Sequence, residues 1–258
     1  MKIIAKSLAT LSAVSLLAFT PLLAMASGGH APTAKATPAS TMKRVIEGNN
    51  SFIHHHATTH FDAFQSGQVP NLTIITCSDS RVQTQLFGFE PDNNIFAIRN
   101  IGNQIVNSEG SVDYGVHHLP TKVLLILGHS SCGAVKAAMG DYSGESSGIK
   151  AELEPLQPML EADPKTGSFD GRWADNVERN VDYQVAKALE LYGDKVEAGE
   201  LAVVGAVYDF NNLWGKGRGA VVVVNVNGEN KPGKIQDHPV LGQLNRGDIV
   251  THVGSRVN

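Results

Sequence analysis

The stretch that decides the fold is LTIITCSDSR, residues 72–81, in which an apolar run ends in a polar turn. The run is rich in β-branched and aliphatic residues and shows no polar alternation, which is typical of a strand buried on both faces. A thiol, a carboxylate and a guanidinium then follow at alternate positions, Cys77, Asp79 and Arg81. The stretch therefore predicts a central strand that carries reactive side chains at its carboxyl end.

Outside this stretch, strand-like and helix-like patterns alternate along the chain. Four more apolar runs predict strands, over residues 95–100, 122–129, 201–209 and 220–227. Apolar residues at helical spacing predict helices over residues 42–56, 108–119 and 175–193, the last ending at Gly193. This alternation predicts an α/β fold with a mostly parallel central β-sheet flanked by helices.

The N-terminal segment has the pattern of a secretory signal. Lys2 and Lys6 precede an apolar run of residues 8–23, and the small-residue sequence Ala24-Met25-Ala26 follows it. The run is too short and too rich in Ser and Thr for a retained membrane anchor. We therefore expect a signal peptide over 1–26, a flexible linker over 27–41 and a single domain over 42–258, in a periplasmic or secreted protein.

The charge balance narrows the class of substrate. The formal net charge is −4, and it becomes more negative when the two leader lysines are removed. No basic cluster is present, which argues against nucleic acid and anionic lipid as partners. No other segment is long enough to span a membrane, so we expect no membrane association after signal cleavage and a small-molecule substrate.

The chain's two cysteines, Cys77 and Cys132, allow two interpretations. In an exported protein an even number of cysteines favours a disulfide. His129, however, lies three residues before Cys132 at the end of another predicted strand, and ligands of α/β sheets gather at that edge. Two cysteines and one histidine with an open fourth position suit catalytic zinc. Gly128 and Gly133 would supply backbone freedom at this turn.

Asp79 and Arg81 are interpreted together with these residues. A D-x-R pair on a surface is most often an ordinary ion pair that contributes little. Beside two candidate zinc ligands, Asp79 instead lies where it can reach the fourth position of the metal, with Arg81 as its bidentate partner.

Several motifs together carry a family resemblance. CSDSRV at 77–82 and HSSCGA, which begins 52 residues later at His129, resemble the C-x-D-x-R and H-x-x-C signatures of the β-class carbonic anhydrases. Further similar segments are VIEGNNSF at 45–52, FEPDNNIFAIRNIGN at 89–103, SVDYGV at 111–116 and GAVYD at 205–209. The second of these departs from the family pattern by one extra residue between Pro91 and Phe96, and by Asn93 where Gly is usual. The chain resembles an exported bacterial member.

The resemblance implies zinc-dependent, reversible hydration of carbon dioxide to bicarbonate and a proton, a lyase reaction. It implies that Cys77, His129 and Cys132 ligate one Zn²⁺ per chain, with a water or hydroxide as fourth ligand. Asp79 would accept a hydrogen bond from that hydroxide, and Arg81 would keep Asp79 ionised and oriented.

The resemblance also implies a substrate pocket and an assembly. Its members would be Gln68 as donor to the substrate oxygen, the Gly133 amide beside the reacting centre, and an apolar wall of Phe96, Ile101 and Tyr114. The partner chain would contribute part of that wall across a dimer interface, so we expect a homodimer or a tetramer.

The resemblance also bears on inhibition. Members of the family that bicarbonate inhibits at a second site have Trp three residues before the first cysteine. Here that residue is Ile74, which predicts no such inhibition.

Two other functions stay open on the sequence alone. The same site could hydrolyse carbonyl sulfide or carbon disulfide, since a zinc hydroxide attacks any such cumulated carbon. Alternatively, the chain could be an exported binding or scaffold domain with a Cys77–Cys132 disulfide.

Several other conspicuous residues are interpreted as surface, interface or packing residues. They are His54–His56, His60, His117, His118, Trp173, Trp214 and the loop 211–221.

Overall fold

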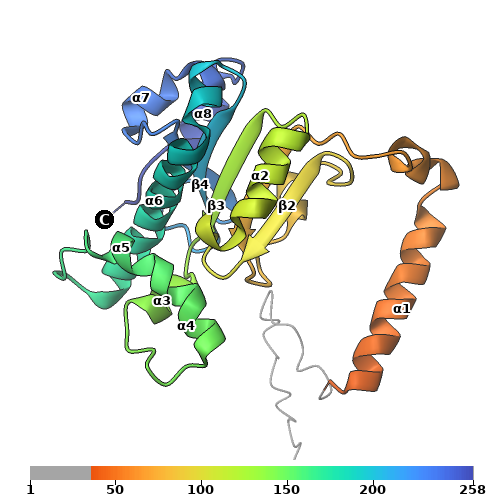
Figure 1. Cartoon of the computed structure of the whole chain (residues 1–258), viewed down its shortest axis with the longest axis horizontal. Coiled ribbons are helices and arrows are strands. Elements are labelled where there is room, and N and C mark those ends of the chain that lie inside the picture. The colour runs from red at the N-terminus through yellow and green to blue at the C-terminus, as the bar shows by residue number, and fades with distance from the viewer. Residues whose placement is uncertain (1–35, 258) are drawn as a thin grey trace, which may run out of the picture. The chain divides into compact units, whose positions relative to one another are not determined.

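The structure, a computed structural model, describes residues 36–257 (Figure 1). The predicted signal peptide 1–26 and most of the predicted linker lie outside the described residues. The chain divides into an N-terminal unit that ends at Phe61 and a larger unit that begins at Asp62. In the N-terminal unit, helix α1 (Pro38–His55) has no buried residue. No helix among the described residues is long and apolar enough to cross a membrane.

The larger unit is built on a five-stranded sheet in the order β2-β1-β3-β4-β5. The strands are β1 (Leu72–Cys77), β2 (Ile95–Asn100), β3 (Val123–His129), β4 (Ala202–Asp209) and β5 (Ala220–Val226). The first four are parallel, and β5 pairs antiparallel with β4. The predicted mostly parallel α/β sheet is confirmed, and each predicted strand matches an observed one to within one residue at either end.

The register brings the carboxyl ends of β1 and β3 to one edge. Cys77, the last residue of β1, lies opposite Asn100 of β2, and His129, the last of β3, lies opposite Tyr208 of β4. Parallel neighbours end on the same side, so the segments after Cys77 and His129 leave the sheet together.

Helices cover both faces of the sheet. One face packs against α2 (Glu109–His118), α3 (Gly133–Ala138) and the long α6 (Phe169–Glu197), in a core that includes Ile75, Ile126 and Val203. The short helices α4 (Ser147–Leu153) and α5 (Gln157–Leu160) join this side through Leu153 and Met159. The other face packs against α7 (Pro232–Gln236) and α8 (Arg246–His252). Figure 1 shows α2 and α6 running across the sheet.

Short 3₁₀ segments fill most of the remaining connections. They are η1 (Thr58–Phe64), η2 (Thr84–Phe87), η3 (Val106–Ser108), η4 (Glu154–Leu156) and η5 (Pro239–Leu241).

Two glycines let α6 lie close to the sheet. A Cβ added to Gly128 of β3 would lie 2.7 Å from Val181 Cγ2, and one added to Gly205 of β4 would lie 2.7 Å from Val181 Cγ1. The role predicted for Gly128 and Gly133 was wrong, because neither residue has a positive φ. The residue of the His129–Cys132 turn that does is Ser131, at φ 56°.

Three helix boundaries differ from the sequence prediction, and one of them is the start of α6, which lies at Phe169, directly after the cap residue Ser168, and not at residue 175. Helix α1 begins at Pro38, inside the stretch assigned to the linker, because Thr37 and Ser40 form a capping box. Helix α6 runs through Gly193 to Glu197, since Val196 in its last turn still packs against the core.

Candidate metal centre

Cys77, His129 and Cys132 converge at the carboxyl edge of the sheet. Their ligand atoms all lie within 4.8 Å of one another, and all three residues are buried. Neither cysteine is in a disulfide, which removes the structural basis of the scaffold interpretation. The donor set of two sulfurs and one imidazole nitrogen matches the preference of zinc.

The orientation of His129 fits metal binding. Its Nδ1 lies 3.0 Å from the carbonyl oxygen of Ser130, which fixes the ring. Its Nε2 is buried and has no hydrogen-bond partner among the described residues. A buried, unpartnered imidazole nitrogen is costly, and a metal between it and the two sulfurs removes that cost.

The two thiols are electrostatically unlike. The pKa of Cys77 is lowered, first by its hydrogen bond with Cys132 and then by His129 and the backbone of Gly102, against the opposing effect of burial. The pKa of Cys132 is raised, first by the hydrogen bond to Cys77 and then by burial. The sulfurs therefore favour sharing one proton, and a cation in its place stabilises both as thiolates.

Asp79 is held beside this triad by Arg81. Arg81 donates from its backbone N and its Nε to Asp79 Oδ1, both at 2.9 Å, and from Nη2 to Oδ2 at 2.7 Å. These bonds hold the pKa of Asp79 well below its usual range. Asp79 Oδ2 is 3.8 Å from His129 Nε2. An ionised acceptor thus lies next to the metal ligands but is bound to Arg81.

Comparison with known proteins agrees with this geometry. The family model for carbonic anhydrase matches residues 72–217, more than half of the chain. The chain belongs to the carbonic anhydrase family. These enzymes hydrate carbon dioxide reversibly, and the fold is that of the β class.

Individual relatives support the same assignment. The chain is 27% identical over 190 residues to carbonic anhydrase 2 of Mycobacterium tuberculosis, a match that covers 68% of this chain and 90% of that protein. It resembles the β-carbonic anhydrase of Coccomyxa, solved with acetazolamide, at 25% identity and a TM-score of 0.62, over 84% of this chain and 96% of that one. A tetrameric β-carbonic anhydrase of Sordaria macrospora shares the fold, with a TM-score of 0.63, 24% identity and coverage of 72% and 97%.

Two of the predicted substrate residues of this carbonic anhydrase lie at the metal edge. Ile101 follows the last residue of β2 and is 36% exposed, and its neighbour Gly102 hydrogen-bonds Cys77 through the backbone. Gly133 is the first residue of α3, directly after Cys132, and is exposed.

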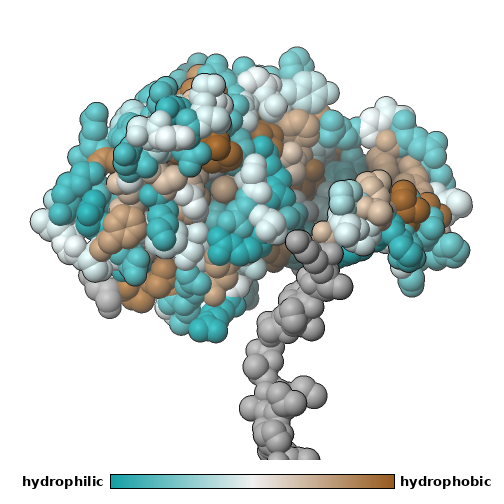
Figure 2. All heavy atoms as spheres, turned by 90° about the horizontal axis from the view of Figure 1, so that it is seen from below, coloured by the Kyte–Doolittle hydropathy of each residue, from teal (hydrophilic) through white to brown (hydrophobic). Residues whose placement is uncertain are grey.

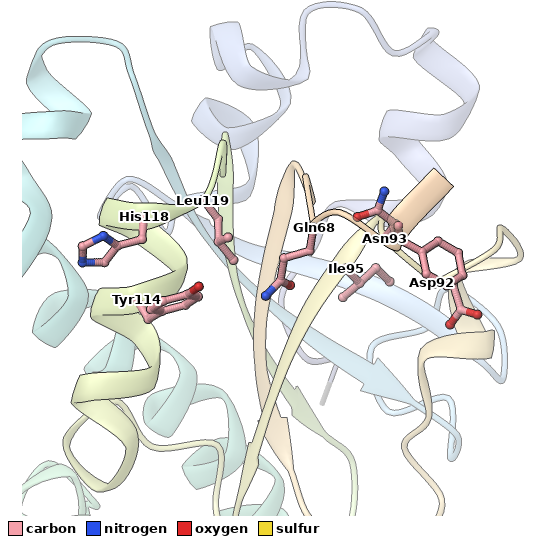
Figure 3. Close-up of a pocket in the computed structure, with 9 residues that line it drawn as sticks. Gln68, Asp92, Asn93, Ile95, Tyr114, His118 and Leu119 are labelled. Atoms are coloured by element: carbon pink, nitrogen blue, oxygen red, sulfur yellow. The ribbon is translucent and has the colours of Figure 1, made fainter. Parts of the chain in front are cut away.

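The other three lie at the opposite end of the sheet. Gln68 precedes β1, Phe96 pairs with Thr73 near the start of the strands, and Tyr114 on α2 lies 5.7 Å from the Phe96 ring. Gln68 and Tyr114 line a pocket of about 640 Å³, shown in Figure 3. A strand as long as β1 spans roughly 17 Å, so these side chains cannot meet the metal ligands of the same chain.

The extra residue in the 89–103 segment forms a turn beside Gln68. Asn93 has φ 60°, and its Oδ1 accepts a hydrogen bond from the backbone N of Val69 at 2.8 Å. Asn and Asp tolerate this conformation better than other side chains. The extra residue therefore changes the backbone only at this turn, which forms part of the wall of the pocket in Figure 3.

Contacts across the fold reveal residues whose support of the metal site the sequence did not indicate. Arg99 donates to the carbonyl oxygens of Cys77 and Asp79. The indole of Trp173 donates to the carbonyl of Cys132 at 2.8 Å. Phe210 lies beside His129 and Arg81. None of the three belongs to the C-x-D-x-R or H-x-x-C signature. Arg99 lies in the family-like segment 89–103, whereas Trp173 and Phe210 reach the site only through tertiary contacts.

Five of the other histidines lie in two parts of the fold, on α2 and at the end of α1. His118 lines the pocket of Gln68 and stacks on Tyr114 at 5.4 Å, whereas His117 contacts Tyr192. His54, His55 and His56 each place Nδ1 near the carbonyl of the residue four positions earlier. Among the described residues, only Cys77, His129 and Cys132 form a group of three metal-ligand side chains.

Proposed function

We propose that this chain hydrates carbon dioxide at the edge of the sheet formed by Cys77, His129 and Cys132. The observation that carries the proposal is the convergence of these three buried ligands, with ligand atoms within 4.8 Å of one another, beside the Asp79–Arg81 pair. We further propose that the triad holds one zinc ion per chain.

Each residue then has a defined task. Zinc held by the triad supplies a Lewis acid that lowers the pKa of bound water toward neutrality. Asp79 accepts a hydrogen bond from the attacking water and orients it toward the carbon of the substrate. Arg81 keeps Asp79 ionised and prevents it from turning toward the ligands, because its guanidinium engages both carboxylate oxygens.

A second copy of the chain would complete the substrate pocket. Gln68, Phe96 and Tyr114 lie at the opposite end of the sheet from Cys77, so only the partner of a symmetric dimer can bring them to the metal edge. In this arrangement the partner's Gln68 donates to the substrate oxygen, and the two aromatic rings form an apolar wall suited to neutral carbon dioxide. The assembly is thus a homodimer or a tetramer built from it.

The surface of helix α1 supports such an assembly. Its exposed apolar residues are Met42, Val45, Ile46, Phe52 and Ile53, between 39% and 56% exposed. Figure 2 shows apolar side chains in brown among hydrophilic ones in the N-terminal unit. Large exposed apolar side chains on one helix mark an interaction surface, and a second copy of the chain is the partner we propose.

Zinc stoichiometry and carbon dioxide hydration, measured on the same purified sample, test the proposal. We expect about one zinc per chain, as a single three-residue site implies. Asp79→Asn should keep the zinc and lose about a hundredfold or more in kcat, because an amide cannot replace the ionised acceptor. Arg81→Gln should keep the zinc and lose less.

Two results would reject the assignment. A sample without zinc, with Cys77 and Cys132 crosslinked despite purification under reductant, would reject the metal site. Full zinc occupancy without carbon dioxide turnover, together with hydrolysis of carbonyl sulfide or carbon disulfide, would assign the site to those substrates instead.

We also propose that the chain is exported, to the periplasm or the medium, as a bacterial enzyme of this class. The basic, apolar and small-residue order of residues 1–26 supports export. Mass spectrometry of the protein secreted by its host should find Ser27 as the first residue. An intact N-terminus in the cytoplasmic fraction would contradict export.

A further inference from the structure

The loop after β4 is anchored firmly to the core. Buried Asp209 accepts hydrogen bonds from the backbone N of Asn211 at 3.0 Å and of Trp214 at 2.9 Å. The Trp214 side chain is fully buried, and its indole donates to Glu178 Oε2 at 2.6 Å. The residues between these anchors, Phe210–Leu213, therefore have little freedom to move.

From these anchors the loop contacts the metal-ligand turn. The backbone N of Phe210 donates to Ser130 Oγ at 3.0 Å, and Asn211 Nδ2 donates to Ser131 Oγ at 2.5 Å. Ser131 is the turn residue with positive φ, so Asn211 stabilises the conformation that places Cys132 near His129.

The ring of Phe210 reaches the site itself. It lies 5.6 Å from the His129 ring, and the Cζ of Arg81 lies 4.7 Å from its centroid. Arg81 thus has its Nε and Nη2 on Asp79, and its guanidinium lies over the aromatic ring. The Arg81 side chain is 51% exposed, so the contacts with Asp79, Phe210 and the Ser131 carbonyl oppose its rotation into solvent.

We propose that Phe210 is a positioning residue for the reaction: its ring holds the Arg81 guanidinium in the orientation in which Arg81 binds Asp79. The inference rests on the proposed function of the Asp79–Arg81 pair. An aromatic face attracts a guanidinium electrostatically, which an aliphatic side chain of similar size does not. The aromatic character of residue 210, and not only its volume, therefore determines how firmly Asp79 is held.

Two substitutions separate these properties. Phe210→Tyr keeps the aromatic face, whereas Phe210→Leu fills most of the volume without it. Phe89→Leu is the control, because Phe89 is 48% exposed and stacks on Phe87 in another part of the unit. All three variants should retain zinc and fold, which zinc analysis and thermal unfolding establish.

The first readout is independent of turnover. Phenylglyoxal modifies exposed arginines, and mass spectrometry of the peptide that contains Arg81 gives the rate at that residue. We expect Phe210→Leu to raise this rate severalfold, and Phe210→Tyr and Phe89→Leu to leave it unchanged. The second readout is carbon dioxide hydration, in which Phe210→Leu should lower kcat about tenfold with KM nearly constant, because the neutral substrate does not bind Arg81.

Equal modification rates at Arg81 in the Leu and Tyr variants would overturn the inference. So would a tenfold lower kcat in both variants. An inactive parent enzyme would instead refute the proposed function, and the modification rates would still show whether Phe210 holds Arg81.

Discussion

At the scale of single residues, the guanidinium of Arg99 already donates hydrogen bonds to three acceptors within the protein. It donates to the carbonyl oxygen of Asp79 at 2.8 Å, to that of Cys77 at 3.1 Å and to Gln83 Oε1 at 2.9 Å. Ile74 is buried and stands at the position where the bicarbonate-inhibited members of the family have a tryptophan, so the chain departs from those members here. A bicarbonate ion that bound Arg99 would have to displace the carbonyl oxygens of Cys77 and Asp79 from its guanidinium, and no tryptophan indole stands at residue 74 to support the ion.

We therefore expect bicarbonate to inhibit only as the product, competitively and without cooperativity. Initial rates of carbon dioxide hydration across a bicarbonate series give the form of the inhibition. The variant Ile74→Trp, which introduces the missing tryptophan, is measured in the same way for comparison with the parent enzyme. Sigmoidal inhibition of the parent enzyme that carbon dioxide does not relieve would contradict this prediction.

The two thiols determine how the protein responds to metal loss. Their ligand atoms lie within 4.8 Å of each other, and the lowered pKa of Cys77 favours its reactive thiolate form. Chelation in air should therefore yield a protein that regains activity with zinc only after a reductant is added. Thiol titration should fall from about two per chain toward zero, the change expected for one disulfide. Complete recovery with zinc alone would refute this expectation.

At the scale of elements, the contact of α6 with β3 and β4 depends on missing side chains. A Cβ on Gly205 would lie 2.7 Å from Val181 Cγ1 and 2.9 Å from Val185 Cγ2. Gly205→Ala should therefore lower the free energy of unfolding by about 1–3 kcal/mol, the usual cost of overpacking a core. Denaturant unfolding measures this change. Adding Val181→Ala should restore part of the loss, and strictly additive losses would show that the two sites do not clash.

An ion pair between the α5–α6 connection and α6 makes the stability of the fold depend on pH. Asp163 has no exposed side-chain area and accepts from Arg172 Nη2 at 2.6 Å, which holds its pKa well below the usual range. A carboxyl whose pKa is lower in the folded state stabilises the protein above its unfolded pKa, about 4, and loses that effect as pH falls through the folded value. Asp163→Asn should thus lower Tm somewhat more at pH 7 than at pH 3, and the difference should grow as the pH falls further toward the folded-state pKa. Equal shifts at both pH values would contradict the charge argument.

These elements also show what the sequence could and could not predict. Strands β1, β3 and β4 were predictable because burial on both faces leaves a continuous apolar run, and the edge strands β2 and β5 were predictable from their apolar and β-branched residues although they are less buried. Helices α3, α4, α5, α7 and α8, of 4 to 7 residues, were not predicted, since fewer than two turns show no periodicity. The ligands were predictable from two local signatures. Phe210 and Trp173 were not, because they reach the site only through tertiary contacts, and the family-like segment 89–103 gave the position of Arg99 but not its contacts with Cys77 and Asp79.

At the scale of the whole molecule, the separation of Gln68 from Cys77 means that the proposed active site takes its residues from two chains. Gln68 lies before β1 and Cys77 at its end, so in the proposed dimer each site takes its ligands from one chain and its glutamine from the other. Cys77→Ser should abolish zinc binding at its own site. Gln68→Ala should keep zinc but lose about a hundredfold in kcat, as removal of a transition-state donor does.

Mixing these two variants tests the shared site directly. In a dimer of one Cys77→Ser chain and one Gln68→Ala chain, one site receives both defects and the other receives none. Co-expression with two different tags and sequential affinity purification isolates this mixed dimer. It should recover about half of the parent activity per dimer, since one of its two sites is intact. If Gln68 acted on the metal site of its own chain, every site would carry one defect. The mixed dimer would then be as inactive as the two single-variant proteins.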